Sequence, residues 1–191
     1  MALTKVDISM LEDAGATGQI LTSDGTNWTS AAAAGGGKIL QVLSYSKTDR
    51  FTSSGTAWND ITGMTLTITP SATTSKILIL VHASIANTSA ASSGAHVRLL
   101  RGSTPICVGV GSLGNRMAVS FESNVNAGSR ASTSGSIVHL DAPGVTTAVV
   151  YKLQGKVPAG TGFGLNRITT DNNDAYTCYK ASSITLQEIS V

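Results

Sequence analysis

The fold is decided by residues 64–82, which read MTLTITPSATTSKILILVH. In the first part Met64, Leu66 and Ile68 alternate with threonines, and this period of two is typical of a half-buried β-strand. Turn-forming residues then interrupt the pattern between Pro70 and Ser75. The second part, from Lys76 to His82, is apolar on both faces, so we expect its own sandwich to cover one face and a neighbouring sheet or subunit to cover the other. This run is predicted to be the central strand.

Similar short runs recur along the chain, separated by clusters of Gly, Ser, Asn and Pro. They lie at residues 39–45, 64–69, 76–82, 96–101, 105–110, 117–122, 136–140, 148–153, 162–168, 175–180 and 184–189. No segment after residue 37 has apolar residues at helical spacing over three turns. About ten strands at this spacing predict an all-β antiparallel sandwich, and the absence of an immunoglobulin-type Cys-Trp-Cys pattern favours a jelly roll.

The first 37 residues differ from the rest and are predicted to form an extended arm with a hairpin and a linker, before a head domain at 38–191. Asp24-Gly25 suits a tight hairpin turn between Ile20-Leu21 and Trp28. A lone hairpin is marginally stable in water, so we expect the arm to pack against other chains or against a virion partner. The residues predicted to anchor the arm are Val6, Ile8, Leu11, Ile20, Leu21 and Trp28.

The composition is poor in charge. Charged residues make up 13% of the chain, against about 25% in ordinary soluble proteins. Because the chain is 41% hydrophobic with a net charge of +2, it is expected to fold and not to remain disordered. So little charge beside alternating apolar residues favours burial against other subunits. The scattered Lys and Arg residues argue against nucleic acid as a partner.

Targeting and redox signals are few. The N-terminal residues lack the apolar core of a signal peptide, and the longest apolar run, Ile77 to Val81, is shorter than the ~20 residues that span a bilayer. We therefore expect a soluble protein made in a cytoplasm, without membrane insertion. Cys107 and Cys178 are then expected to be small buried apolar residues and not a disulfide.

Signals for catalysis and cofactors are also few. Gly109 to Gly114 satisfies a dinucleotide fingerprint, but a strand-like run follows where a helix is required, so a turn is favoured. His82, His96 and His139 lie in separate predicted strands, without metal-ligand spacing. No nucleophile elbow or paired carboxylate motif is present. The sequence predicts no enzyme activity, no cofactor and no metal site.

One loop combines hydrogen-bonding groups with aromatic faces that suit a sugar. The Asp171 to Asp174 segment lacks the rest of a calcium-binding loop and is interpreted first as a polar turn. Flanking tyrosines either contribute to a receptor site or stabilise the sandwich or the seam between subunits. The candidate receptor-contact residues are Arg167, Asp171, Asn172, Asn173, Asp174 and Tyr176, with Tyr179 nearby.

Both ends of the chain carry a resemblance. Leu3 to Ile8 with Gly18 to Gly25 resembles the lead-in segment of tail-fibre and related virion proteins of tailed bacteriophages, particularly those of marine and cyanobacterial hosts. Phe163 to Arg167, the polar loop from Thr169 to Asp174 and the closing run from Ser182 to Ile189 resemble the last two strands of the trimeric jelly-roll heads on such fibres. These heads are similar in plan to complement C1q and tumour necrosis factor domains.

The resemblance implies a homotrimer around a threefold axis, assembled in the host cytoplasm and located in the virion. Its N-terminal arm would join other virion structural proteins, and its head would face a host surface glycan or protein. Two alternatives remain open at this stage. One is a capsid decoration protein that grips the shell with the same arm, and the other is an appendage enzyme that degrades polysaccharide.

Overall fold

The structure is a computed structural model that describes residues 19–23, 26, 28–32, 37–88, 94–110, 114–123, 130–159 and 162–191. The chain divides into two units, Met1–Lys38 with Val191, and Ile39–Ser190. In the described part of the chain no helix has the length and apolar composition that a membrane crossing requires.

The first unit contains a β-hairpin. β1 (Gln19–Ser23) pairs antiparallel with β2 (Trp28–Ala32), from Gln19 opposite Ala32 to Ser23 opposite Trp28. This pairing confirms the predicted hairpin. Val6, Ile8 and Leu11 lie outside the described residues, and so do the side chains of Ile20, Leu21 and Trp28, so their role in attachment stays a prediction.

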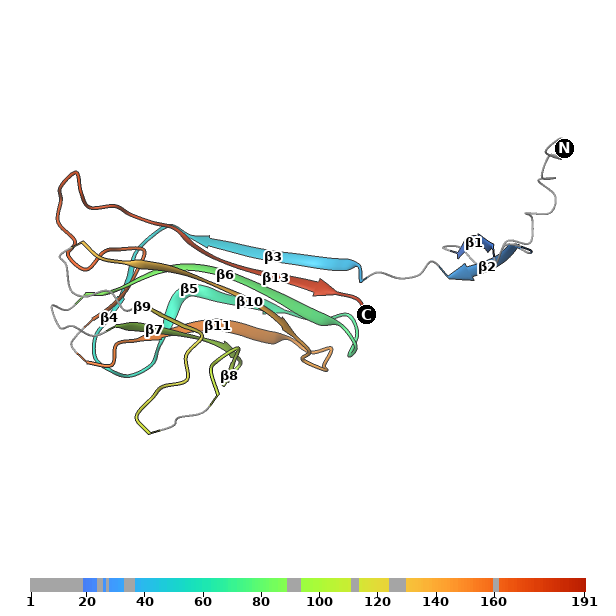
Figure 1. Cartoon of the computed structure of the whole chain (residues 1–191), viewed down its shortest axis with the longest axis horizontal. Coiled ribbons are helices and arrows are strands. Elements are labelled where there is room, and N and C mark those ends of the chain that lie inside the picture. Colours follow the sequence, from blue (N-terminus) through green and yellow to red (C-terminus); the bar gives the residue numbers. More distant parts are fainter. Residues whose placement is uncertain are drawn as a thin grey trace. The chain divides into compact units, whose positions relative to one another are not determined.

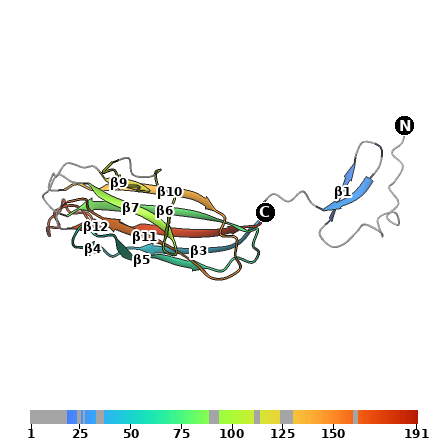
Figure 2. The ribbon, with the colours of Figure 1, turned by 90° about the horizontal axis from the view of Figure 1, so that it is seen from below.

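The second unit is a sandwich of two antiparallel sheets. The six-stranded sheet contains β3 (Ile39–Lys47), β4 (Phe51–Ser53), β6 (Lys76–Asn87), β10 (Thr133–Asp141), β12 (Phe163–Leu165) and β13 (Ser182–Ile189). The five-stranded sheet contains β5 (Asn59–Ile68), β7 (Ala95–Arg101), β8 (Thr104–Ile106), β9 (Phe121–Ser123) and β11 (Val149–Lys156). In Figure 1 β3, β13 and β6 lie above β7, β8 and β11, and Figure 2 shows strands of both sheets following the same long direction. The all-β antiparallel prediction is confirmed.

β6 is the central strand of its sheet. One of its edges pairs with β10, and the other pairs first with β13 and then with β12. β3 pairs with β13, and β4 pairs with β12, which completes the sheet. The apolar run at 76–82 therefore lies at the centre of the sheet, as predicted.

In the five-stranded sheet β11 lies between β5 and β7. The free edge of β7 is shared, because β8 pairs with Leu99 to Arg101 and β9 pairs with Ala95 to Val97. This arrangement brings side chains of β5, β11, β7 and β9 into common rows across the outer face of the sheet.

The core lies between the sheets and follows the alternation of the strands. In β13 and β11 every second residue is buried, and fully burying each large apolar side chain contributes about 1.5–3 kcal/mol. Tyr151 and Phe163 are the largest fully buried side chains. The Phe163 ring occupies space left by Gly155, where an added Cβ would lie 2.4 Å from Cζ of the ring.

Several predicted strand limits are wrong. The run at 175–180 forms no strand, and its Tyr176 and Tyr179 are 72% and 70% exposed. The run from Pro105 ends at Ile106, because Cys107 adopts a φ of 50° that an extended strand does not accommodate. In the run at 117–122 only the last two residues join a strand, β9. The short strand β4 was not predicted.

The prediction for the cysteines is also wrong. Cys107 and Cys178 are both free, but they are exposed and not buried. Cys107 occupies a turn with left-handed backbone geometry after β8, and Cys178 lies in the long connection between β12 and β13. Neither position faces the core, because neither belongs to a strand with an inward face.

Candidate functional site

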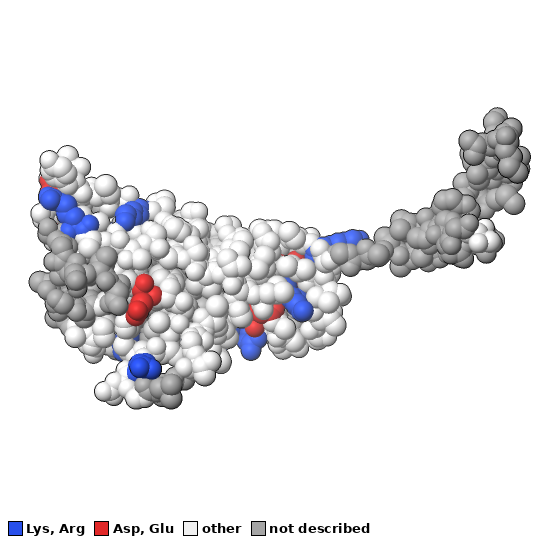
Figure 3. All heavy atoms as spheres, viewed as in Figure 1, with Lys and Arg blue, Asp and Glu red and all other residues white. Residues whose placement is uncertain are grey.

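One candidate surface is the outer face of the six-stranded sheet. Outward-facing side chains form three consecutive rows across β10, β6, β13 and β3, in that order. These rows contain no Lys, Arg, Asp or Glu. The rows are Leu140, Leu78, Gln187 and Val42; Val138, Leu80, Thr185 and Ser44; and Ser136, His82, Ser183 and Ser46. We call this surface the uncharged face. On the side of the molecule that Figure 3 presents, charged side chains are few and most of the described surface is uncharged.

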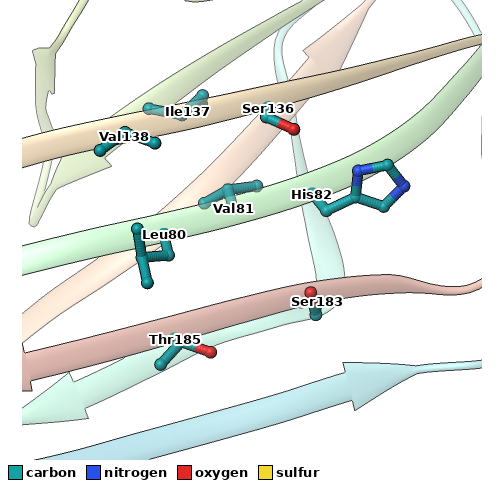
Figure 4. Close-up of a pocket in the computed structure, with 8 residues that line it drawn as sticks. All are labelled: Leu80, Val81, His82, Ser136, Ile137, Val138, Ser183 and Thr185. Atoms are coloured by element: carbon teal, nitrogen blue, oxygen red, sulfur yellow. The ribbon is translucent and has the colours of Figure 1, made fainter.

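The uncharged face is most apolar at one end and polar at the other. Val138 is 70% exposed, and Leu140 and Val42 are about half exposed. A shallow depression lies between Leu80, Val138 and neighbouring hydroxyl groups, with His82 at its side, and Figure 4 shows these side chains on β6, β10 and β13. Lys76 occupies the next outward position, at the beginning of β6. Exposed apolar area of this kind is typical of a contact surface.

A second candidate surface is the connection between β12 and β13, which we call the 166–181 loop. Asn166 fixes its base with a left-handed φ of 60°. The buried Asn166 amide donates to the carbonyl oxygens of Lys47 at 2.8 Å and Asp49 at 3.0 Å, and it accepts a hydrogen bond from Ser182 Oγ at 2.6 Å. The loop therefore leaves the sandwich from a rigid point.

Two predicted receptor residues come together in this loop. Asp174 accepts a hydrogen bond from Arg130 Nη2 at 2.8 Å, and the Arg130 guanidinium lies 4.8 Å from the ring centre of Tyr176. The hydrogen bond from Arg130 lowers the pKa of Asp174, and bonds from Thr177 and the Tyr176 backbone act in the same direction. Because Tyr176 is mostly exposed, it does not stabilise the sandwich.

The other predicted receptor residues are dispersed. Arg167 donates to the carbonyl oxygens of residues 168 and 169. Asp171 is ion-paired with Arg50, from the segment before β4. Asn172 and Asn173 are exposed. Since the carboxylates of Asp171 and Asp174 each face a guanidinium group, the segment fits the polar turn better than a calcium loop.

A third surface was missed by the sequence reasoning. It lies on the outer face of the five-stranded sheet, where the register places Asp60, Gln154 and Arg98 in one row. Trp58 comes two residues before Asp60, and the alternating positions Lys152 and Lys156 flank Gln154 on β11. We call this group the Trp58 platform. It consists of Trp58, Asp60, Arg98, Lys152, Gln154 and Lys156.

The platform is held by a chain of hydrogen bonds. Arg98 donates to Gln154 Oε1 through Nε at 2.9 Å and Nη2 at 2.7 Å. Gln154 donates to Asp60 Oδ1 at 2.6 Å, and Lys152 donates to Asp60 Oδ2 at 2.7 Å. These bonds, that from Lys152 first, lower the pKa of Asp60. The carboxylate is therefore ionised at neutral pH and holds its neighbours in place.

Two cations lie over the aromatic ring of the platform. The Arg98 guanidinium carbon is 4.2 Å from the Trp58 ring centre, and Lys156 Nζ is 5.5 Å from it. Both distances lie within the range of cation–π attraction. Trp58 is half-buried, so its side chain reaches the surface of the platform.

The remaining titratable residues form no metal cluster in the described ranges. His82, His96 and His139 lie on β6, β7 and β10, and no group of three potential metal ligands is present among the described residues. Asp141 accepts hydrogen bonds from Arg101 and from Tyr151 Oη at 2.6 Å, and burial raises the pKa of Tyr151. This cluster ties β10 to β7 and β11 at the edge of the core.

Fold and surfaces together define an antiparallel β-sandwich protein with a hairpin in its N-terminal unit. No protein-family model matches the sequence, and no curated protein matches it. Similar solved structures come from infectious bursal disease virus. A chain of its T13 viral particle is 8% identical with a TM-score of 0.42, and 89% of this chain and 41% of that chain are covered. The structure of the Gx strain is 12% identical with a TM-score of 0.38, covering 90% and 42%. The present chain thus spans about two fifths of the length of these viral chains.

Proposed function

We propose that the chain is a subunit of a structural virion appendage, a tail fibre or short fibre, and that it assembles as a homotrimer. The N-terminal unit joins other virion structural proteins, and the sandwich is the head that faces a host glycan or protein. The proposal assigns the chain a binding role without catalysis. The stoichiometry of three comes from the resemblance to trimeric fibre heads.

The uncharged face carries the proposal, because it suits packing against other copies of the chain around a threefold axis. Identical charged faces repel each other, whereas rows of Leu, Val, Ser and Thr bring no such cost. Four strands about 4.8 Å apart and three rows about 6.8 Å apart give the uncharged face a projected area of roughly 400 Å². One partner's share of a standard interface is about 800 Å². The face therefore supplies about half of one partner's share of a stable contact.

A charge placed on the uncharged face tests this packing. The Val138→Glu substitution replaces a mostly exposed side chain, so it leaves the core of the single chain unchanged. Where copies pack through the uncharged face, the introduced glutamates come close together and repel each other. Thr67→Glu is the matched control, since Thr67 is an exposed β-branched residue on the outer face of the other sheet. Sedimentation velocity is measured for both variants and for the unaltered chain, with circular dichroism as the test of folding.

The expected result is a trimer for the unaltered chain and for Thr67→Glu, and a folded monomer for Val138→Glu. A folded Val138→Glu protein that remains trimeric would exclude this face as the seam. Equal dissociation of both variants would show a non-specific effect of charge and would also contradict the proposal.

The position in the virion is tested separately. An antibody raised against the head domain is expected to label the tail of intact virions in electron micrographs. Labelling distributed over the shell would replace the fibre proposal with a capsid decoration protein. Release of oligosaccharides from host envelope polysaccharide by the purified protein would favour the appendage enzyme instead.

A further inference from the structure

The Trp58 platform concentrates positive charge in a protein that has little charge elsewhere. Arg98, Lys152 and Lys156 contribute three positive charges and Asp60 one negative charge, so the platform has a net charge of +2, the same as the whole chain. Glu122 lies one strand further along the sheet, opposite His96. Lys156 Nζ has neither a carboxylate nor a hydrogen-bond partner in the described part of the chain. An anionic ligand would therefore find an unneutralised ammonium group here.

The side chains of the platform are positioned before any ligand arrives. Gln154 fixes the Arg98 guanidinium through Nε and Nη2, which leaves Nη1 to point elsewhere. Asp60 holds both Gln154 and Lys152. Holding long side chains in one conformation costs entropy when an interface forms. Since the structure already orders these groups, binding loses less entropy than at an unorganised basic surface.

The indole ring of Trp58 adds a preference for ligands with a flat apolar face. A half-buried indole offers a flat apolar surface, and the apolar face of a pyranose ring packs on such a surface while its polar groups reach neighbouring donors. Guanidinium and ammonium groups are the natural partners of a carboxylate. We propose that the Trp58 platform binds an anionic saccharide whose sugar rings carry carboxylate groups. Trp58 packs against a sugar ring, and Arg98 and Lys156 pair with its carboxylate.

The 166–181 loop offers a useful comparison, because it also has an arginine over an aromatic ring. There the charge of Arg130 is neutralised by Asp174 at 2.8 Å, so the pair has no net charge. An arginine therefore stacks on an aromatic ring at both surfaces, but only the Trp58 platform has excess positive charge. An anionic saccharide is expected to prefer the platform over the loop.

The inference deepens the proposed function, since it names the class of host ligand and the face that binds it. In the proposed trimer the platform points away from the seam, because it lies on the sheet opposite the uncharged face. Binding does not itself require three subunits. Measuring the oligomeric mass of the same samples therefore separates failure of the ligand inference from failure of the fibre proposal.

The test is isothermal titration calorimetry of the full chain with tetragalacturonate as the probe and a neutral galactose tetramer as the matched ligand. Inorganic phosphate is added as a competitor to detect a simple anion site. The variants are Trp58→Ala and Lys156→Gln, with Arg130→Gln as the control that removes the equivalent cation from the 166–181 loop. Circular dichroism verifies the fold, and Lys156→Gln changes only a surface group.

We expect the unaltered chain to bind tetragalacturonate, Trp58→Ala and Lys156→Gln to weaken binding about tenfold each, and Arg130→Gln to leave it unchanged. The neutral tetramer is expected to bind at least about tenfold more weakly. Absence of binding, equal binding of the neutral tetramer, displacement by phosphate at equal concentration, or loss of binding only in Arg130→Gln would each overturn the inference. A trimer that fails to bind would leave the fibre proposal standing.

Discussion

Glu188, on β13, is expected to have a large effect on the stability of the fold. The carboxylate is almost fully buried, and Oε1 accepts hydrogen bonds from the backbone N and the Oγ of Ser71, both at 2.6 Å. Oε2 accepts a bond from Gln41 Nε2 at 2.6 Å. Burial alone would raise the pKa of Glu188, but the bonds from Ser71 and Gln41 outweigh it and lower the pKa to about 2. The ionised carboxylate thus ties the connection between β5 and β6 to the sheet.

The size and sign of the effect follow from this shift. An unfolded glutamate has a pKa of about 4.3, so the difference of roughly 2 units corresponds to about 3 kcal/mol of stabilisation at neutral pH. Because the folded pKa is the lower one, the stabilisation is complete well above pH 4.3 and is lost as the pH falls toward 2. About half of it is expected to be lost between pH 7 and pH 3.

The perturbation is Glu188→Gln, assayed by urea unfolding at pH 7 and pH 3 at one protein concentration. At pH 7 the variant is expected to lose about 2–3 kcal/mol of unfolding free energy. Its stability is expected to fall less between pH 7 and pH 3 than that of the unaltered chain, by about 1–2 kcal/mol. Glu122→Gln makes the same chemical change at a half-exposed carboxylate and is the control. A Glu188→Gln variant with unchanged pH dependence would refute the assignment.

Three further substitutions test the packing of the head. Gly155→Ala places a Cβ 2.4 Å from the Phe163 ring, so its thermal unfolding is expected to show a loss of about 1–3 kcal/mol. Asp141→Asn weakens the bond that Tyr151 donates and is expected to cost about 1–3 kcal/mol in urea unfolding. Asn166→Ala removes the side-chain bonds at the base of the 166–181 loop, so limited proteolysis is expected to cleave that loop several-fold faster. Unchanged unfolding in the first two variants, or unchanged cleavage in the third, would contradict the respective contact.

The strands that the sequence predicts best are those with one buried face. At residues 64–69 and 184–189 alternation follows from burial, so the pattern identifies β5 and β13 directly. The run at 175–180 shows a similar alternation, with Tyr176, Cys178 and Lys180 at every second position. It remains a loop, because none of its residues pairs with another strand. The three residues of β4 are too few to show a period at all.

The candidate surfaces depend on information that the sequence does not contain. The Trp58 platform combines Asp60, Arg98 and Gln154, which are far apart along the chain and become neighbours only through the register of β5, β7 and β11. The uncharged face was foreseen in part, since the apolar positions of the run at 76–82 implied a cover on both sides. Its extension over four strands required the pairing of β6 with β10 and β13.

The most direct test of the account is the native mass of the full chain under non-denaturing conditions, because the fibre proposal depends on copies packing through the uncharged face. Native mass spectrometry at neutral pH is expected to show an assembly of three 19.5 kDa chains. A single species at 19.5 kDa, unchanged as the protein concentration rises, would contradict the account.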